Sequence, residues 1–384
     1  MKLRVYGSTK PGYTLPVPEA LKMAGHEAGI CYMPEDLDTL LAEPEKKTFG
    51  RVRGTVGSGH HSVSGHPYYS IVLEGVPKIV AMILNNEKEY NTSEKSGRYT
   101  VMATGGEEQR IYEKWTKIFD DLIEHKYPEI DERTRKKLAL ENARYFISVF
   151  TPSTVMGYTA NLRQLNYIIG YCEDLCATPS TDPFILALKP HLFELANLLR
   201  GLCNVDGLRD NRGRKFSLFA ERERKEFFDE CYSVNYEGSF AQLAQAHRHR
   251  SLWYEMQIPQ LDNCKFYVPP IITSDDLRAE YLRDMESLKE NFPQGMLVKI
   301  NERGTAEAFT WKCNERLCGA AQREICIQTQ QTLDRYLYGC LAADNQEVYK
   351  FLSHYRDKTK CQFGYYVCNR PCPLGPKRAF TRLI

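Results

Sequence analysis

Residues 70–80 read SIVLEGVPKIV, and residues 232–244 read YSVNYEGSFAQLA. Each stretch has a short apolar run typical of a β-strand, then a Glu-Gly turn, then apolar residues at helical spacing. Pro77 suits the first position of the first helix because its fixed φ matches helical backbone there, and Ser239 can cap the second helix. The same strand–turn–helix unit is therefore predicted at two places in the chain.

A polar cluster and a long amphipathic helix follow each unit. In the first half a helix covers 108–147, with a break at Pro128 and a new start capped by Asp131. In the second half Ser274 caps a helix that stops at 293–295. Because the order of elements occurs twice, we interpret the chain as a degenerate tandem repeat.

The rest of the chain sets the boundaries of these copies. Residues 1–58 are expected to be an irregular lead-in with a strand at KLRVYG and a Leu-rich helix near 36–42. Residues 182–203 predict a helix with a kink at Pro190. The polar, Gly-rich segment 204–225 marks the boundary between halves. This organisation predicts a first copy at 1–204 and a second copy at 205–384 that ends in a cysteine-containing tail.

Composition excludes some classes of protein. The 384 residues are 42% hydrophobic with a net charge of +2, so no strong field favours nucleic acid or a membrane surface. No apolar run approaches 18 residues, and the N-terminus has no apolar signal region. The thirteen cysteines are expected to be mostly buried free thiols. We therefore expect a soluble, cytoplasmic protein.

Residues 245–251, QAHRHRS, place two arginines and a histidine after the second helix. Cations at a helix C-terminus are stabilised by the macrodipole, so a solvated helix end explains them without any function. Consecutive helical residues point in different directions, however, which favours an anion-binding site for Arg248, His249 and Arg250. Both interpretations stay open on these residues alone.

Three further clusters have alternative interpretations. SEKSGRY (93–99) is a polar turn or a phosphate cradle made by a hydroxyl, a glycine amide and a guanidinium. GHHSVSGH (59–66) holds three histidines, but their spacing fits no standard zinc pattern. CQFGYYVCNRPC (361–372), with Cys340 or His354, could form a structural zinc site, although free thiols are the default.

Taken in order, these motifs resemble the flavin-dependent thymidylate synthase family. That family has a histidine motif, an R-H-R motif and an S-G-R-Y motif. ENARYFI (141–147) is similar to its alanine-arginine segment, and TANLRQL (159–165) to its asparagine-x-arginine helix start. NERLCGAAQREI (314–325) is similar to its N-x-R…A-Q-x-E-I segment. Gly65 stands where the family has a glutamate.

Each half lacks part of this motif set, and the losses are complementary. In the first half Asn86, Glu87 and Lys88 occupy the R-H-R slot, and in the second half 258–260 replace S-G-R-Y. The resemblance implies composite substrate sites, with phosphate-side residues from the first copy and uracil-side residues from the second. The implied substrate-binding residues are Glu94, Ser96, Gly97, Arg98 and Arg144, together with Gln245, Arg248 and Arg316.

The resemblance also implies the fold, the reaction and the cofactors. It implies an α/β (α+β) fold with two tandem thymidylate-synthase-like domains, each a mixed sheet flanked by helices. The reaction would convert dUMP to dTMP, with methylenetetrahydrofolate as carbon donor and NADPH reducing FAD. Arg316 and Arg248 would stabilise charge on the uracil ring, and a homodimer would form a pseudo-tetramer. FAD would be held by His60, Ser62, Asn161, Arg163, Arg248, His249 and Arg250.

Two alternatives remain beside this reading. The first is flavin- and folate-dependent modification of another pyrimidine nucleotide. The second is a non-catalytic nucleotide-binding protein that has lost flavin, which the loss of the glutamate at Gly65 favours. Retention of flavin separates the last possibility from the other two.

Overall fold

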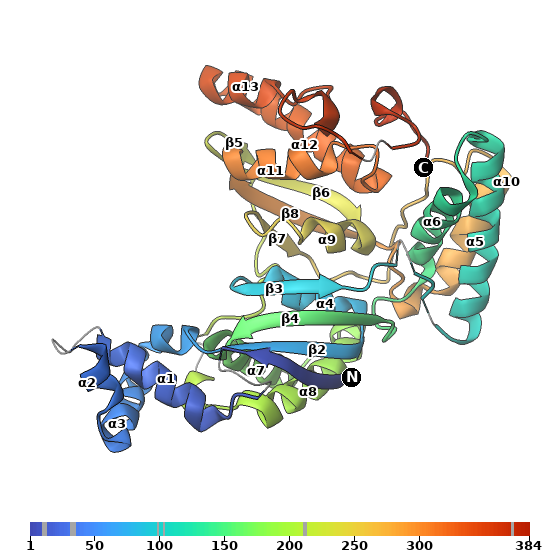
Figure 1. Cartoon of the computed structure of the whole chain (residues 1–384). Coiled ribbons are helices and arrows are strands. Elements are labelled where there is room, and N and C mark those ends of the chain that lie inside the picture. Colours follow the sequence, from blue (N-terminus) through green and yellow to red (C-terminus); the bar gives the residue numbers. More distant parts are fainter. Residues whose placement is uncertain (10–13, 31–35, 98–99, 103, 210–212, 370–371) are drawn as a thin grey trace. The chain divides into compact units, whose positions relative to one another are not determined.

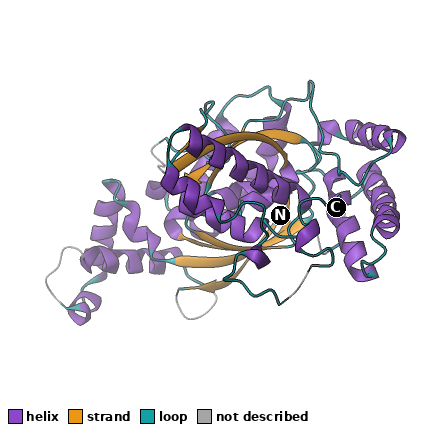
Figure 2. Cartoon of the chain, turned by 90° about the horizontal axis from the view of Figure 1, so that it is seen from above, coloured by secondary structure: helices purple, strands orange, loops and turns teal. Residues whose placement is uncertain are grey.

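The computed structural model describes residues 1–9, 14–30, 36–97, 100–102, 104–209, 213–369 and 372–384. The chain divides into two compact units. Unit 1 comprises Met1–Lys95 and Pro152–Phe216, and unit 2 comprises Ser96–Thr151 and Ser217–Ile384. Strands form two sheets, one in each unit, and most of the other regular structure is helical (Figures 1 and 2).

Unit 1 contains a four-stranded sheet with the order β1-β2-β4-β3. Its inner face is apolar, since Ile71 and Leu73 of β2 and Met156 and Tyr158 of β4 are buried. Asn161 caps α7 by accepting a hydrogen bond from the Gln164 amide at 2.8 Å. The elements of this unit are β1 (Lys2–Ser8), α1 (Val17–Ile30), α2 (Leu37–Leu41), α3 (Glu45–Gly57), η1 (His61–Gly65), β2 (Tyr68–Val76), α4 (Lys78–Asn86), β3 (Tyr90–Glu94), β4 (Thr154–Asn161), α7 (Leu162–Ala177), α8 (Pro183–Cys203) and η3 (Asp206–Leu208).

Unit 2 contains a second four-stranded sheet, with the equivalent order β5-β6-β8-β7. Tyr232, Ile300 and Phe309 are buried on its helix-covered face, and Ser239 and Ser274 cap α9 and α10 as predicted. The elements are α5 (Gly106–Lys126), α6 (Glu132–Ala143), η2 (Arg144–Phe146), β5 (Phe227–Phe228), β6 (Cys231–Ser239), α9 (Phe240–Ala246), β7 (Trp253–Met256), α10 (Asp275–Ser287), η4 (Lys289–Asn291), β8 (Leu297–Thr305), α11 (Ala306–Arg316), α12 (Arg323–Ala342), α13 (Gln346–Ser353), η5 (Lys360–Gln362) and η6 (Pro376–Arg378).

The α/β class with helix-flanked sheets is confirmed, but the sheets are antiparallel and not mixed. In the first sheet β2 and β3 both pair antiparallel with β4, so they run in the same direction without pairing with each other. In the second sheet β6 and β7 have the same relation to β8. Because β4 lies between β2 and β3, and β8 lies between β6 and β7, the strands that run in the same direction do not pair with each other. All pairings of the named strands are therefore antiparallel.

The expectation of an irregular lead-in was wrong, because α1 and α3 are helices of 14 and 13 residues. Their contact uses small side chains: Ala24 and Ala28 are buried, and a Cβ built at Gly25 would lie 2.6 Å from Thr48 Cγ2. A stripe of alanine and glycine is weakly hydrophobic, so periodicity of large apolar residues does not reveal it.

Residues 96–151 pack with the second half of the chain, although they precede it in sequence. Trp115 Nε1 of α5 donates to Asp284 Oδ2 of α10 at 2.7 Å. The Trp115 ring also packs edge-on against the Tyr281 ring, with 4.9 Å between the ring centroids. The core around them includes Phe119, Phe146 and other buried residues of both segments. This shared core places the alanine-arginine segment in the same unit as the second-half motifs.

Candidate functional site

The alanine-arginine segment and the A-Q-x-E-I segment meet in unit 2. Arg144 Nη2 donates to Gln322 Oε1, and Gln322 Nε2 donates to the Tyr145 hydroxyl. Tyr145 in turn donates to Glu324 Oε2 at 2.8 Å. Both Arg144 and Gln322 are buried. Residues about 180 positions apart therefore form one hydrogen-bonded cluster.

Gln245 connects this cluster to Arg316. Its Nε2 donates to Gln322 Oε1, the same oxygen that receives Arg144. Arg316 Nη2 donates to the Gln245 main-chain oxygen at 2.9 Å. Three of the predicted substrate-binding residues, Arg144, Gln245 and Arg316, are thus brought together. The sequence did not single out Tyr145, whose only signal is its place directly after Arg144.

His249 lies at the other end of Arg316. Arg316 Nε donates to His249 Nε2 at 2.7 Å, so this ring nitrogen is an acceptor. Burial, together with the positive charges of Arg316 and Lys312, holds the pKa of His249 well below its usual range. A neutral His249 keeps the Arg316 guanidinium oriented without adding a competing charge.

A buried ion pair lies one helical turn before Arg316 on α11. Lys312 Nζ contacts Glu302 Oε2 at 2.6 Å, and both side chains are fully buried. Tyr232 donates to the other oxygen of Glu302 at 2.7 Å, and Gln328 accepts from Lys312 at 2.7 Å. Burial lowers the pKa of Lys312, whereas Glu302 acts to raise it. Sequence reasoning missed this pair because a single Lys and Glu carry no periodic signal.

The S-G-R-Y segment is described only in part. A Cβ built at Gly97 would lie 3.7 Å from Arg144 Cδ, so the chain at Gly97 runs directly beside that arginine. Ser96 is half-buried, and Arg98 lies outside the described residues. Glu94 belongs to unit 1, where its buried carboxylate accepts from Lys78 at 2.6 Å and Asn85 at 3.2 Å. Within the described part of unit 2, the backbone at Gly97 therefore lies next to Arg144.

We expected the R-H-R tripeptide to form the end of the helix. This expectation was wrong, because the tripeptide lies beyond the end of α9. α9 ends at Ala246, and Arg248 and His249 follow in hydrogen-bonded turns, with their amides donating to Gln245 and Ala246 oxygens. Arg248 and Arg250 are exposed, whereas His249 is buried between them. The alternation of exposed, buried and exposed side chains at Arg248, His249 and Arg250 comes from the geometry of these turns, because α9 has already ended at Ala246.

The other candidate flavin residues gather in unit 1. Arg163 Nη2 and Asn161 Nδ2 both donate to the Glu89 carboxylate, the second at 3.2 Å. A Cβ built at Gly65 would lie 3.8 Å from Asn161 Nδ2. Although burial acts to raise it, the pKa of Glu89 is lowered by hydrogen bonds from Arg163 and Asn161. Glu89 is thus bound to Asn161 and Arg163, the two side chains that a Cβ at Gly65 would meet.

These residues also fit an anionic group. Among the described residues no acceptor reaches the buried Arg163 Nε, so this donor is available to a ligand. His60 and Ser62 are exposed around the same short element, η1, that contains Gly65. The neighbouring His61 instead points inward, with Nδ1 3.0 Å from the Tyr167 hydroxyl.

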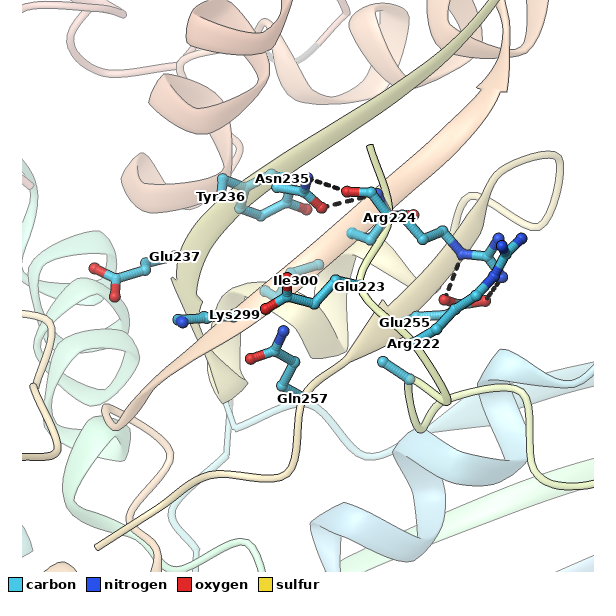
Figure 3. A pocket seen from close by; sticks show the side chains of 12 residues that line it. Arg222, Glu223, Arg224, Asn235, Tyr236, Glu237, Glu255, Gln257, Lys299 and Ile300 are labelled. Carbon is cyan, nitrogen blue, oxygen red and sulfur yellow. Dashed lines mark hydrogen bonds and ion pairs between the residues drawn. The ribbon is translucent and has the colours of Figure 1, made fainter. Parts of the chain in front are cut away.

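Cavities in the described part of unit 2 include two of ligand size. One, of about 450 Å³, is lined by Arg316 and by tail residues that include Lys360, Tyr366 and Cys372. The other, of about 330 Å³, lies on the polar face of the second sheet, under residues 220–224 (Figure 3). There Glu255 accepts from Arg224 Nε at 2.7 Å. Only the first cavity includes a predicted site residue.

Three expectations concern metals, thiols and membranes. Within the described ranges, no three His, Cys, Asp or Glu side chains gather as a metal site. The cysteines of those ranges are free; Cys172 and Cys313 are among the buried ones, whereas Cys231 and Cys361 are exposed. No helix in the described part of the chain is long and apolar enough to span a bilayer.

Residues 14–179 match the family described as "Thymidylate synthase complementing protein". The resemblance drawn from the motifs is therefore confirmed there, whereas the second-half motifs lie beyond the matched residues. A similar solved structure is the flavin dependent thymidylate synthase ThyX from helicobacter pylori complexed with FAD and dUMP, at 16% identity and a TM-score of 0.31. The similarity covers 53% of this chain and 100% of that chain. A search of the curated proteins finds no match.

Proposed function

We propose that the chain is a flavin-dependent thymidylate synthase that methylates dUMP to dTMP. Methylenetetrahydrofolate would give the carbon, and NADPH would reduce FAD. One observation carries the proposal: Arg144, from a first-half motif, and Gln245, from a second-half motif, donate to the same oxygen of Gln322. Complementary motif losses have a physical meaning if both halves serve one nucleotide site.

Each residue has a role that its chemistry supports. Arg144, with Ser96, Gly97 and Arg98, would bind the nucleotide phosphate through charge-assisted hydrogen bonds. Gln245 would bind the edge of the pyrimidine ring. Arg316, with Arg248, would stabilise negative charge on the ring oxygens.

FAD would supply hydride transfer when bound. His60, Ser62, Asn161 and Arg163 would hold it, with Arg248, His249 and Arg250, as the resemblance implies. The matched family segment 14–179 includes the first four of these residues. The solved relative named above is a complex with FAD and dUMP.

We also propose the tandem organisation, with copies at 1–204 and 205–384 that assemble as a homodimer. The identical relative order of strands in the two sheets supports a duplication. The compact units differ from these copies because residues 96–151 pack in unit 2. This exchange supports sites that combine residues of both copies.

A nucleotide-binding protein without flavin is the second candidate, and Glu89 favours it. Its carboxylate neutralises Arg163, which weakens the attraction for a flavin phosphate. Such a protein would bind dUMP in unit 2 and perform no turnover.

An absorption spectrum separates these candidates. The purified protein is supplemented with FAD, desalted and titrated with dUMP, and turnover of dUMP to dTMP is assayed with the co-substrates. A retained flavin band that shifts with dUMP, together with turnover, supports the synthase. Binding of dUMP without retained flavin supports the second candidate, and no binding of either contradicts both.

A further inference from the structure

Glu324 is the fixed end of a hydrogen-bond relay that leads to Gln245. Its carboxylate accepts from the Ser239 amide at 2.8 Å and from the Ser239 hydroxyl at 2.7 Å. Ser239 Oγ itself accepts from the Gln242 amide at 3.0 Å, so its proton points to Glu324. The backbone donor makes Glu324 an acceptor at this end of the relay.

Tyr145 continues the relay with the same direction of hydrogen bonding, toward Glu324. Its one proton goes to Glu324, so its oxygen accepts from Gln322 Nε2. Burial, and then the charge of Glu324, raise the pKa of Tyr145, which keeps the hydroxyl protonated. Gly295 fixes the backbone here, because its amide donates to the main-chain carbonyl oxygen of Tyr145 at 2.8 Å. A Cβ built at Gly295 would lie 3.0 Å from Tyr145 Cβ, so only glycine fits this close approach.

Gln322 then has a defined orientation. With Nε2 toward Tyr145, its Oε1 faces Arg144 Nη2 and Gln245 Nε2. Arg144 checks this assignment independently, since a guanidinium only donates and requires an oxygen opposite it. Gln245 must therefore present its Nε2 to Gln322 and its Oε1 elsewhere.

The Oε1 of Gln245 is the open end of the relay. It is buried, and within the described ranges no donor reaches it. A buried acceptor without a partner costs roughly 1–3 kcal/mol, so a ligand N–H at this position is favoured. Uracil offers an N–H at ring position 3, whereas cytosine has an acceptor there.

We propose that the relay Glu324–Tyr145–Gln322 is a specificity device: it locks the amide of Gln245 so that the site selects a pyrimidine that donates at ring position 3 and rejects one that accepts there. Glu324, Tyr145 and Gln322 are positioning residues, and Gln245 contacts the ligand. The inference rests on the proposed nucleotide site and identifies which residues set its base preference.

Glu324→Gln tests the direction of the relay. The new amide would accept from the Ser239 N–H and donate to Tyr145, whose proton would then turn to Gln322. Arg144 keeps Gln322 Oε1 in place, so the Tyr145 proton and Gln322 Nε2 would then oppose each other as two donors, and this bond of the relay would be lost. Gln245 would be held only by Gln322 Oε1 and the Ala241 main-chain oxygen, without a fixed Gln322 behind it. The preference for dUMP over dCMP, which we expect to be about tenfold to a hundredfold in the wild type, would decrease.

The measurement is isothermal titration of dUMP and dCMP into the full-length wild type, Glu324→Gln and Tyr145→Phe. Tyr145→Phe is the matched control, because it removes the bond to Gln322 without placing a donor against Gln322 Nε2, so the preference should decrease less than in Glu324→Gln. Circular dichroism checks that each variant folds.

Three outcomes would overturn the inference in different ways. Equal binding of dUMP and dCMP by the wild type overturns the relay and leaves the nucleotide site intact, and needs no variant to fold. Equal weakening of both nucleotides in Glu324→Gln, with the ratio unchanged, shows a merely structural role. Binding of neither nucleotide by the wild type removes the proposed function as well.

Discussion

The two sheets have the same strand order but different chemistry on their helix-covered faces. Strand pairing aligns Tyr158, opposite Ile71, with Glu302, opposite Val234. The following helices begin at Leu162 and Ala306, so Ile168 has the same place on α7 as Lys312 has on α11. A buried aromatic and aliphatic pair in unit 1 thus corresponds to a buried ion pair in unit 2.

A second difference follows the helix after the second strand. In unit 1 Asn86, Glu87 and Lys88 stand at the end of α4 and are followed by Glu89, whereas in unit 2 Arg248, His249 and Arg250 follow α9. Glu89 of the first segment pairs with an arginine of its own unit, whereas His249 of the second segment, which lies between two exposed arginines, accepts from Arg316. One framework can therefore carry opposite charges in the segments that follow corresponding helices, because loops after helices are less constrained than the sheet.

Lys312→Met should cause the largest loss of stability and so test the difference between the two sheets most directly. It leaves Glu302 buried without its cation, which costs roughly 3–5 kcal/mol, and denaturant unfolding measures the loss. Ile168→Met at the equivalent place in unit 1 is the control, with an expected loss under about 1.5 kcal/mol. Similar losses in the two variants would show that the ion pair adds nothing specific.

Arg316→Gln should weaken binding of dUMP by about tenfold to a hundredfold, because charge-assisted hydrogen bonds contribute about 1.5–3 kcal/mol. Titration calorimetry measures the affinity. Arg283→Gln, on the exposed surface of α10, changes the same charge away from the site and should leave the affinity unchanged. An unaltered affinity in Arg316→Gln would remove Arg316 from the binding site.

The pH dependence of stability should depend on His249. Because its folded-state pKa lies below that of the unfolded chain, the unfolded state binds the proton first as pH falls below about 6.5. Stability from this group is therefore present above that pH and lost below it, by at most about 1.4 kcal/mol per pH unit. His249→Gln keeps an acceptor for Arg316 and should flatten the unfolding free energy between pH 6.5 and 5. The exposed His125→Gln is its control, and an equal slope in both variants would contradict the assignment.

Glu89→Gln should have the smallest effect, a several-fold gain in retained FAD. Removing the carboxylate charge frees Arg163 and Asn161 for an anionic ligand at an exposed, salt-screened position. Flavin absorbance after desalting measures retention. Lys95→Gln, which removes a charge at the other end of β3 in the same unit, should not raise it. A loss of flavin in Glu89→Gln would mean that Glu89 itself supports binding.

The sequence by itself predicted the elements with strong local signals. The strands at 70–73 and 232–236, the break before Asp131 and the caps at Ser239 and Ser274 follow from periodicity and capping, which depend on neighbouring residues only. The prediction that the two Glu-Gly pairs are turns was wrong, because β2 and β6 continue through them. From the resemblance the sequence also predicted that Arg144, Gln245 and Arg316 belong to one site. These three residues lie together in unit 2, and their binding of a ligand stays a prediction. The alanine-rich helix α1 was not predicted, because its small side chains are buried only by contact with α3.

Tertiary structure decided the rest. Only the shared core of α5, α6 and α10 brings Arg144 to Gln322, because such a contact depends on chain segments about 180 residues apart. The orientation of the Gln245 amide depends on Glu324, Tyr145 and Gln322 together, and the pairing of Lys312 with Glu302 depends on a helix crossing a strand. Local sequence patterns specify elements, whereas hydrogen bonds between distant side chains exist only after those elements have packed.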